Sequence, residues 1–393
     1  MISDWTLWLE WLIKALVVTL ALLTGFAYLT WYERRALARL QVRIGPNRAG
    51  PQGLLQPIAD AVKLIFKEEL TPAKADKLVF FWAPVVTLVP SIIIAAVIPW
   101  GTSFTLWTGR VITLYVADIN VGVLYIMSIA SIAVYGIVLA GWSSNNKYAM
   151  IGGLRSSAQM ISYELALGLS FVTSIILANS MRLLDIVEAQ RHMWFVVVQP
   201  VGAVIFWIAT LAEVNRAPFD MPEAEQELTA GYHSEYSGMK FALFFMAEYQ
   251  KMIVICAIAA TLYFGGFREF GFLSNTFFSV DHKWMLGSME ITNWFLGPVY
   301  LFLKVVALLF GMIWVRATWP RIRYDRLMSF GWKVMLPISL AITFITAVGI
   351  ILQRELHNDL YYYLGIPVAS ILVGLFTVAM VYRELRRKAY ERA

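Results

Sequence analysis

Residues 241–264 read FALFFMAEYQKMIVICAIAATLYF, an apolar run that contains one glutamate and one lysine. A helical run of this length can cross a hydrocarbon core of about 30 Å at 1.5 Å per residue. Eight other runs of roughly 19 to 24 residues have a similar composition: they lie near 11–31, 78–99, 118–141, 156–178, 194–214, 293–316, 334–352 and 361–382. Most of them lack a polar face with a period of 3.6 residues. We therefore expect an all-α, polytopic helical membrane protein with about nine transmembrane helices.

The composition supports this fold class and excludes several kinds of site. Of the 393 residues, 59% are hydrophobic and 15% are charged, and the mean hydropathy is +0.65. The single cysteine, Cys256, lies within an apolar run, and the four histidines are on separate loops. We therefore expect neither an iron–sulfur cluster nor a metal site in this chain. Glycine-rich nucleotide motifs are missing from the sequence. Electrons for any redox reaction must then come from a partner.

The basic residues predict how the chain is oriented in the membrane. The loops after the first, third, fifth and seventh runs and the C-terminal tail hold roughly 23 of the 32 Lys and Arg residues. Because cytoplasmic loops carry such an excess, we expect the N-terminus outside and the C-terminus in the cytoplasm. This explains the net charge of +6 without nucleic acid. Asp4 and Glu10 stand where a signal peptide would be basic, so the first run is expected to remain as a transmembrane helix.

Several charged residues lie inside the predicted transmembrane runs, among them Glu164, Glu213, Glu248, Lys251 and Lys304. A charge at the bilayer centre costs roughly 2.5 to 3.5 kcal/mol, so such residues usually pair or line a path for ions. Glu248 and Lys251 are three residues apart on one helical face, and we expect them to be close enough to pair. Lys304 has no partner within one turn, so its counter-charge is expected from another helix, with Glu164 and Glu248 as candidates.

The first long cytoplasmic loop, residues 32–77, is predicted to contain an interfacial helix. Leu54 to Glu69 is amphipathic, and about 16 residues are too short to span the bilayer. A surface helix anchored in lipid headgroups by Lys63 and Lys67 would explain this pattern. Asp60 argues against that explanation, because an anionic surface would repel it. We therefore expect Asp60 to face a protein cavity or an arginine of the same loop.

The second long cytoplasmic loop, residues 215–240, is strongly acidic. Four carboxylates fall close together in it: Asp220, Glu223, Glu225 and Glu227. Pro218 and Pro222 prevent a continuous helix through the segment. Clustered carboxylates repel one another, which raises some of their pKa values and lets them hold and exchange protons. A solvated acidic loop is the alternative, although the apolar residues Phe219 and Met221 argue against it.

Carboxylates on several predicted helices, leading toward an acidic loop, are typical of a proton relay. Burial raises the pKa of a carboxyl group and a nearby lysine lowers it, so these groups can take up and release protons. A purely structural ion network would use the same residue types. The residues alone leave both interpretations open.

Four long motifs of the chain resemble one known family. The first combines Glu33-Arg34-Arg35, Arg43-Ile44-Gly45-Pro46-Asn47-Arg48 and Gly53 to Asp60, with Lys63 and Lys67. The others are Ala212 to Asp220 with the three glutamates that follow, Phe244 to Tyr249, and Arg316-Ala317-Thr318-Trp319-Pro320-Arg321-Ile322-Arg323-Tyr324-Asp325. The similarity extends in the same order along the chain, from about residue 10 to 350. On these motifs the chain resembles the H subunit of NADH:quinone oxidoreductase, respiratory complex I. The mitochondrial counterpart is NADH dehydrogenase subunit 1.

The resemblance implies a function and a set of site residues. The chain would form the membrane-side entrance and part of the chamber for a quinone substrate, ubiquinone or menaquinone. Matching positions imply a quinone path bordered by Glu33, Arg34, Arg43, Asp60, Lys63 and Arg316. They also imply a proton relay and acidic gate made of Glu164, Glu213, Asp220, Glu223, Glu225, Glu227, Glu248 and Lys251. No catalytic or metal-binding residue is expected in this chain.

The resemblance also implies partners. Hydrophilic subunits would carry the terminal iron–sulfur cluster and the quinone headgroup pocket, and FMN, NADH and all clusters would be bound by partner subunits. Small membrane subunits and antiporter-like subunits would lie beside the chain in the bilayer. Residues 1–352 would form the eight-helix core, and residues 353–393 would add a C-terminal transmembrane helix and a basic tail, as in some bacterial members. The expected location is a bacterial inner membrane.

Three alternatives remain. One is a membrane anchor with no part in coupling, in which the buried glutamates could be replaced by glutamine without effect. A homologous subunit of a membrane-bound hydrogenase, or of a quinone reductase with another donor, would share these motifs. A secondary transporter would explain the composition and the buried charges, although transporters usually show internal repeats and this chain has no matching halves.

Overall fold

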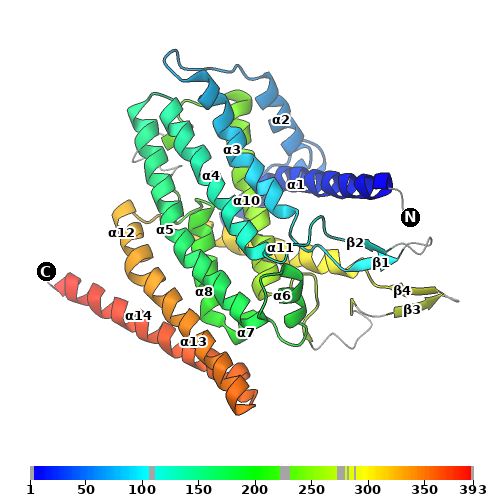
Figure 1. Cartoon of the computed structure of the whole chain (residues 1–393). Helices are drawn as coiled ribbons and strands as arrows, with labels where there is room; N and C mark the ends of the chain where they lie inside the picture. Colours follow the sequence, from blue (N-terminus) through cyan, green and yellow to red (C-terminus); the bar gives the residue numbers. More distant parts are fainter. Residues whose placement is uncertain are drawn as a thin grey trace.

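The chain folds into a bundle of long helices with only two short pairs of strands in the described part (Figure 1). The computed structural model describes residues 4–105, 111–221, 231–271, 279–280, 283–286 and 289–390. Within these residues, eight helical segments are long and apolar enough to cross a membrane: Leu7–Leu40, Lys77–Ala95, Gly122–Ser143, Lys147–Ala178, Gly238–Tyr263, Leu296–Thr318, Tyr324–Leu356 and Tyr361–Arg383. The predicted class, a polytopic helical membrane protein, is confirmed.

Four upright helices form the centre of the bundle (Figure 1): α3 (Lys77–Ala95), α4 (Gly122–Ser143), α5 (Lys147–Ala178) and α10 (Gly238–Tyr263). Their apolar side chains contribute to a large core, which includes the fully buried Tyr163 and Met252, and to a smaller cluster that includes Phe80 and Phe244. α4 and α5 come close where Gly141 faces Ala149 and Gly153. Small residues at such a contact let membrane helices approach each other closely, so this packing follows directly from the sequence.

Polar residues mark the starts of two of these helices. The Asp76 carboxylate accepts hydrogen bonds from the backbone N–H groups of Leu78 and Val79 at the start of α3. The Asn146 side chain accepts one from the N–H of Tyr148 at the start of α5. Both residues thus satisfy donors that a helix leaves without an internal partner.

The fifth predicted run, residues 194–214, is not a single helix of spanning length. It consists of the one-turn helix α7 (Phe195–Val198) and the 14-residue helix α8 (Pro200–Glu213). Pro200 takes the first position of α8, and a residue that precedes proline disfavours the helical conformation. Gln199 accordingly has φ −133° and ψ 68°. The nine predicted runs therefore correspond to eight helices of spanning length and the shorter α8.

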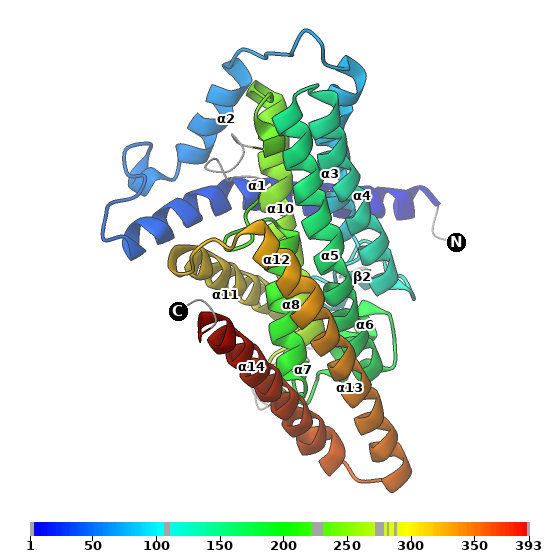
Figure 2. The same cartoon turned by 90° about the vertical axis from the view of Figure 1, so that its left-hand side faces the viewer.

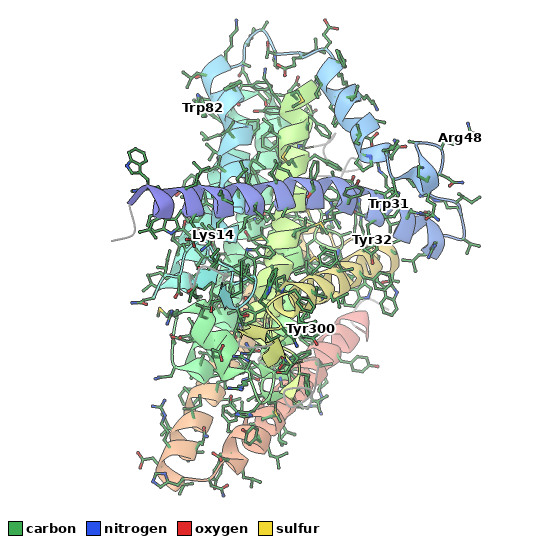
Figure 3. All side chains as sticks on the ribbon, turned by 90° about the vertical axis from the view of Figure 1, so that its right-hand side faces the viewer. Lys14, Trp31, Tyr32, Arg48, Trp82 and Tyr300 are labelled. Atoms are coloured by element: carbon green, nitrogen blue, oxygen red, sulfur yellow. The ribbon has the colours of Figure 1, made fainter. Side chains whose placement is uncertain are left out.

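Two long helices cross the upright bundle. α1 (Asp4–Leu40) and α11 (Leu296–Thr318) run across α10 in Figures 2 and 3 and contact both it and each other. Trp31 and Tyr32 near the end of α1 lie on the same side of the molecule as the loop that carries Arg48 (Figure 3). The crossing brings the ends of α1 and α11 to one side of α10, where the first loop also lies.

The amphipathic helix predicted within Leu54 to Glu69 is present as α2 (Gln56–Phe66), which contacts α1 and α10. Ile58, Ile65 and Phe66 are exposed along it. The turn before it needs glycine at position 53, where φ is +77° and a Cβ would stand 2.3 Å from the Pro46 carbonyl oxygen. The first loop therefore packs as an ordered unit beside the end of α1.

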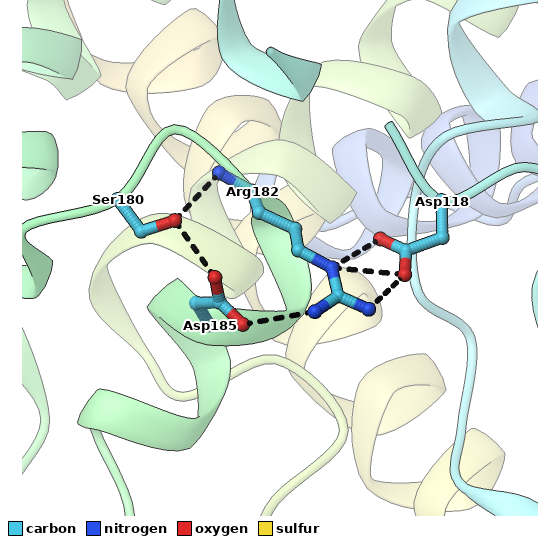
Figure 4. A network of polar contacts seen from close by, with 4 residues as sticks. All are labelled: Asp118, Ser180, Arg182 and Asp185. Carbon is cyan, nitrogen blue, oxygen red and sulfur yellow. Dashed lines mark hydrogen bonds and ion pairs between the residues drawn. The ribbon is translucent and has the colours of Figure 1, made fainter. Parts of the chain in front are cut away.

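The loops at the other end of the bundle are tied together by polar contacts. Two antiparallel hairpins lie there: β1 (Ser103–Thr105) with β2 (Val111–Thr113), and β3 (Lys283–Leu286) with β4 (Met289–Thr292). Figure 4 shows that Arg182 pairs with Asp118 and with Asp185 of α6 (Leu183–Ala189). The Asp118 hydrogen bond raises the pKa of Arg182 above its ordinary value. These contacts fix the segment between α5 and α6 against the segment before α4.

The C-terminal part forms a helical hairpin at one edge of the molecule (Figures 1 and 2). α12 (Tyr324–Phe330), the π-helical turn η4 (Gly331–Met335) and α13 (Leu336–Leu356) form one continuous segment; η5 (Tyr361–Gly365) leads into α14 (Ile366–Tyr390). α14 packs against α13 and the short α8. The C-terminal helix α14 therefore covers α8, which is too short to span a membrane alone.

Candidate functional site

A buried arginine in the segment after α8 lies between carboxylates from two other helices. Arg216 is 3% exposed. Its Nη1 donates to Glu33 Oε1 of α1 at 3.1 Å, and its Nε lies 2.7 Å from Glu248 Oε1 of α10. The guanidinium also lies over the Tyr249 ring, 4.3 Å from the centroid. Burial alone would lower the pKa of Arg216, but Glu248 and Glu33 hold it well above its ordinary value.

Two further arginines extend this cluster. Arg316, in the last turn of α11, also pairs with Glu33, so this carboxylate lies between two guanidinium groups. Arg321 Nη2 lies 2.9 Å from Asp220 Oδ2 of the acidic loop, and the Asp220 carboxylate is almost fully buried. These ion pairs connect the acidic loop with helices α1, α10 and α11.

A second buried ion pair joins α8 to α10. Lys251 Nζ donates to Glu213 Oε1 at 2.6 Å, and the Glu213 side chain is buried. The prediction that Lys251 pairs with Glu248 is wrong, because these two residues take Glu213 and Arg216 as partners instead. Glu248 and Lys251 share one helix face, but each of them pairs with a residue on an element that packs against that face.

Two small adjacent cavities lie beside these residues. The first measures about 40 Å³ for the centre of a water molecule, and Glu164, Glu213 and Lys251 are part of its lining. The second measures about 30 Å³, and its polar lining includes Glu213, Asp220, Glu248, Lys251 and His233. Because one water centre needs about 10–15 Å³, each cavity has room for water. Glu213 and Lys251 line both cavities and therefore stand between them.

Glu164 differs from the other carboxylates of the site. Its partner is the hydroxyl of Ser131 on α4, which donates to Glu164 Oε1. Within the described residues no cation pairs with it, whereas Glu33, Glu213, Asp220 and Glu248 each have at least one cationic partner. Glu164 thus places at the first cavity a carboxylate that has no cationic partner among the described residues.

Lys304 does not belong to this site. Its Nζ donates to the backbone carbonyl oxygens of Phe264, Gly266 and Arg268 at 2.5–2.8 Å and lies over the Trp194 ring. The prediction that Glu164 or Glu248 supplies its counter-charge is wrong. Three carbonyl dipoles at the end of α10 satisfy the ammonium group instead, so Lys304 stabilises the loop that follows this helix.

The first loop contributes a separate polar pair. Arg34 Nη1 lies 2.5 Å from Asp60 Oδ2, and Gln56 donates to the other Asp60 oxygen at 3.1 Å. The prediction that Asp60 faces an arginine of the same loop is confirmed. Both charged side chains are partly open to solvent, at 47% and 32%. The exposed apolar residues of α2 lie beside this pair, so the region offers an apolar surface next to a charged group.

The remaining predicted residues are placed less centrally or not at all. Arg43 and Lys63 are exposed, and Arg43 donates to its neighbour Gln41. Glu223, Glu225 and Glu227 lie outside the described residues. Among the described residues, no three His, Cys, Asp or Glu side chains gather as a metal ion would require.

Sequence reasoning missed three residues of the site: Arg216, Tyr249 and His233. Arg216 lies within the acidic-loop motif, directly after an apolar run that ends in Glu213, and this position was the available signal. Tyr249 ends the motif Phe244 to Tyr249, and this position was its signal. His233 lies outside the four motifs, and only the fold brings its ring to the second cavity.

Spanning helices, paired charges in their interior and small cavities lined with carboxylates define a polytopic membrane protein with a buried ionic network. A sequence model of the family described as NADH dehydrogenase matches residues 13–347. The chain belongs to this family. It is a membrane subunit of an NADH-quinone oxidoreductase.

Individual relatives agree with this assignment. The H 2 subunit of NADH-quinone oxidoreductase from Geobacter metallireducens is 48% identical over 347 residues, which cover 86% of this chain and 94% of that protein. The H 2 subunit from Syntrophobacter fumaroxidans is 47% identical over 88% of this chain and 98% of its own length. The H subunit from Thermomicrobium roseum is 47% identical over 86% and 95%, respectively.

Proposed function

We propose that this chain forms the quinone entrance of the complex and couples quinone reduction to proton translocation through its buried carboxylates. The proposal rests chiefly on one observation: the Glu213–Lys251 pair stands between two cavities that have room for water. Glu164 lines one of them, and Glu248 and Asp220 line the other. Protons can move between carboxylates that water connects, so the cavities offer a route between α5 and the acidic loop.

The charged cluster near the ends of α1 and α11 offers a way to couple the two processes. Arg216 lies between Glu33 and Glu248 in space and contacts both carboxylates. A new charge on the quinone side of Glu33 would therefore act on the cavity through Arg216. At an effective dielectric constant of about 20, a unit charge at 8 Å contributes roughly 2 kcal/mol, or about 1.5 pKa units.

The quinone itself would enter between the end of α1 and α2. The exposed apolar residues of α2 suit an isoprenoid tail, and the Arg34–Asp60 pair lies beside them. The bound substrate would accept two electrons from a cluster held by a hydrophilic partner. Glu33, Arg34, Asp60 and Arg316 would border this path, and the N-terminus would lie outside and the C-terminus in the cytoplasm.

Substitution of Glu213 tests the relay. Glu213→Gln keeps the size and an oxygen acceptor for Lys251 but removes the protonatable group. We expect proton translocation linked to quinone reduction to fall about tenfold or more, since positioned acid–base groups contribute about 10²–10⁴-fold to proton transfer. Pumping is measured in proteoliposomes that contain the purified complex.

Glu188→Gln provides the matched control, because Glu188 pairs with Arg268 and is outside the lining of both cavities. Assembly is verified by the yield of the complex and by NADH oxidation with an artificial acceptor. A Glu213→Gln variant that pumps with the wild-type proton-to-electron ratio would contradict the relay role.

The transporter class predicts a different result in a labelling experiment. A transporter would work as a solitary chain and would bind no quinone. Membranes are solubilised mildly, the chain is isolated and the eluate is labelled with an azido-quinone. Labelling between Glu33 and Lys67, together with co-purified iron–sulfur subunits, supports the proposed function.

A further inference from the structure

One titratable residue of the second cavity has no part in the proposed relay. His233 ends the short helix η2 (Gly231–His233), which lies in the second half of the acidic loop, before α10. It lines the same cavity as Glu248 and Lys251. An acid–base group at this position connects the end of the acidic loop with the ion pairs of α10.

The ring of His233 is fixed by aromatic neighbours. The Tyr232 ring lies 3.9 Å away between centroids, and the Phe244 ring packs edge-on at 5.5 Å. Phe241 completes the enclosure at 5.8 Å. Aromatic packing of this kind holds the imidazole in one orientation, so the placement of its nitrogens is set by the fold.

The Nδ1 atom of His233 is buried and has no hydrogen-bond partner among the residues that the structure describes. Buried polar atoms are normally satisfied, and one that is not requires an explanation such as a water partner or a role in proton transfer. The cavity that His233 lines measures about 30 Å³ for water centres, which is enough for a water molecule that could donate to Nδ1.

We propose that His233 is an additional relay residue whose Nδ1 accepts a proton across the second cavity and returns it. The proton comes from a protonated carboxyl group, Glu248 or Glu213, through a water molecule. An N–H bond forms as an O–H bond breaks, the imidazole becomes an imidazolium, and no electron moves. This inference rests on the proposed function of the cavity but adds a group on the side of the acidic loop.

The charges that face His233 explain why it would carry the proton only briefly. The other titratable groups of the cavity are Glu213 of α8, Asp220 of the acidic loop, Tyr232 of η2, and Glu248 and Lys251 of α10. Each carboxylate has a cation partner, so the cavity is balanced and burial lowers the pKa of His233 to about 4. Opening of one ion pair would leave a carboxylate facing the imidazole and would favour its protonation.

Two substitutions in the intact complex separate proton transfer from packing. His233→Asn keeps an oxygen near Nδ1 that can accept a hydrogen bond but cannot hold a proton. His233→Phe keeps the ring but removes the acceptor. We expect both variants to translocate protons about tenfold more slowly during quinone reduction, with normal yield and normal NADH oxidation by an artificial acceptor. His192→Asn is the control, because His192 is exposed on another loop.

The outcomes distinguish this inference from the relay itself. Normal pumping by His233→Phe, with a defect in His233→Asn alone, would assign His233 to packing and overturn the proposal. Normal pumping by both variants, with a defect in Glu213→Gln, would overturn it and leave the relay standing. Normal pumping by all three would reject both. If His233→Phe lowers the yield of the complex, His233→Met replaces it, since methionine fills a similar volume and has no group that takes up a proton.

Discussion

At the scale of single residues, the centre of the site is Arg216. One buried guanidinium separates Glu33 of α1 from Glu248 of α10, and the Tyr249 ring covers its face. Removing one partner from a buried ion pair typically costs about 3–5 kcal/mol, because the other charge is left without compensation. Arg216 therefore both holds three elements together and places two carboxylates at a fixed separation.

His233 gives the protein a specific pH dependence. Burial lowers its pKa to about 4 from the ordinary value of 6.5. Between these values the unfolded chain binds a proton that the folded chain does not, so stability falls as the pH is lowered through this window and is unaffected above it. The loss approaches about 3 kcal/mol at the acidic end, and partial exposure of the side chain reduces it.

The measurement compares thermal unfolding of the wild-type complex and His233→Phe between pH 7 and pH 5. The melting temperature of the wild type should fall more steeply, because phenylalanine does not titrate. The His192→Asn variant should follow the wild type. Parallel curves for wild type and His233→Phe would show that His233 titrates normally in the folded protein.

Sequence reasoning at this scale succeeded for the pair in the first loop and failed for the buried lysines. The partner of Asp60 was predicted because Asp60 and Arg34, which the structure places at the end of α1, both fall within the predicted loop 32–77. The partners of Lys251 and Lys304 were not, because they come from α8 and from backbone carbonyls after α10. Spacing along a helix shows which residues share a face but not what packs against that face.

At the scale of elements, the acidic loop is anchored by a contact between α5 and η2. At Gly152 of α5, a Cβ atom would stand 2.6 Å from Gly231 Cα and 3.0 Å from its carbonyl carbon. Backbone atoms cannot move aside as the end of a flexible side chain can. Any side chain at position 152 must therefore displace η2, and with it the ring of His233.

Gly152→Ala tests this contact. Alanine favours an isolated helix by about 1 kcal/mol relative to glycine, so α5 itself should form normally. We expect reduced proton pumping with an assembled complex, since the second cavity loses its wall. Gly168→Ala in the same helix is the control: there the Cβ would meet only the Met127 methyl group, at 3.1 Å. Equal activity of the two variants would contradict the anchoring role.

Hydropathy predicted these elements well, with one exception. The spanning runs and the amphipathic α2 were found because length and periodicity are properties of the sequence itself. The fifth run was read as one helix, although Pro200 splits it into α7 and α8. Its apolar composition is continuous across the break, so hydropathy alone has no means of detecting it.

At the scale of the whole molecule, the crossing of α1 and α11 over α10 brings two regions together. The end of α1 carries both Arg34, which pairs with Asp60 of the first loop, and Glu33, which pairs with Arg216. These neighbouring residues thus belong to two different contacts, one partly exposed and one buried. A change at the first loop can act on the buried network through a single turn of helix.

Asp60→Ala tests the exposed side of this arrangement. A partly exposed ion pair contributes only about 0.2–1 kcal/mol to stability, so the complex should still assemble. Loss of the carboxylate frees Arg34 and alters the charged border of the proposed quinone path. We expect quinone reductase activity to fall, while NADH oxidation with an artificial acceptor at the hydrophilic arm continues unchanged.

Glu68→Ala removes an exposed carboxylate from the same loop and serves as the control. Asp60→Asn separates charge from hydrogen bonding, since its amide oxygen can still accept from Gln56. Equal loss of both activities in Asp60→Ala would indicate failed assembly. Unchanged quinone reduction in an assembled Asp60→Ala complex would mean that the Arg34–Asp60 pair does not border the quinone path, and the entrance would then have to lie elsewhere on α1.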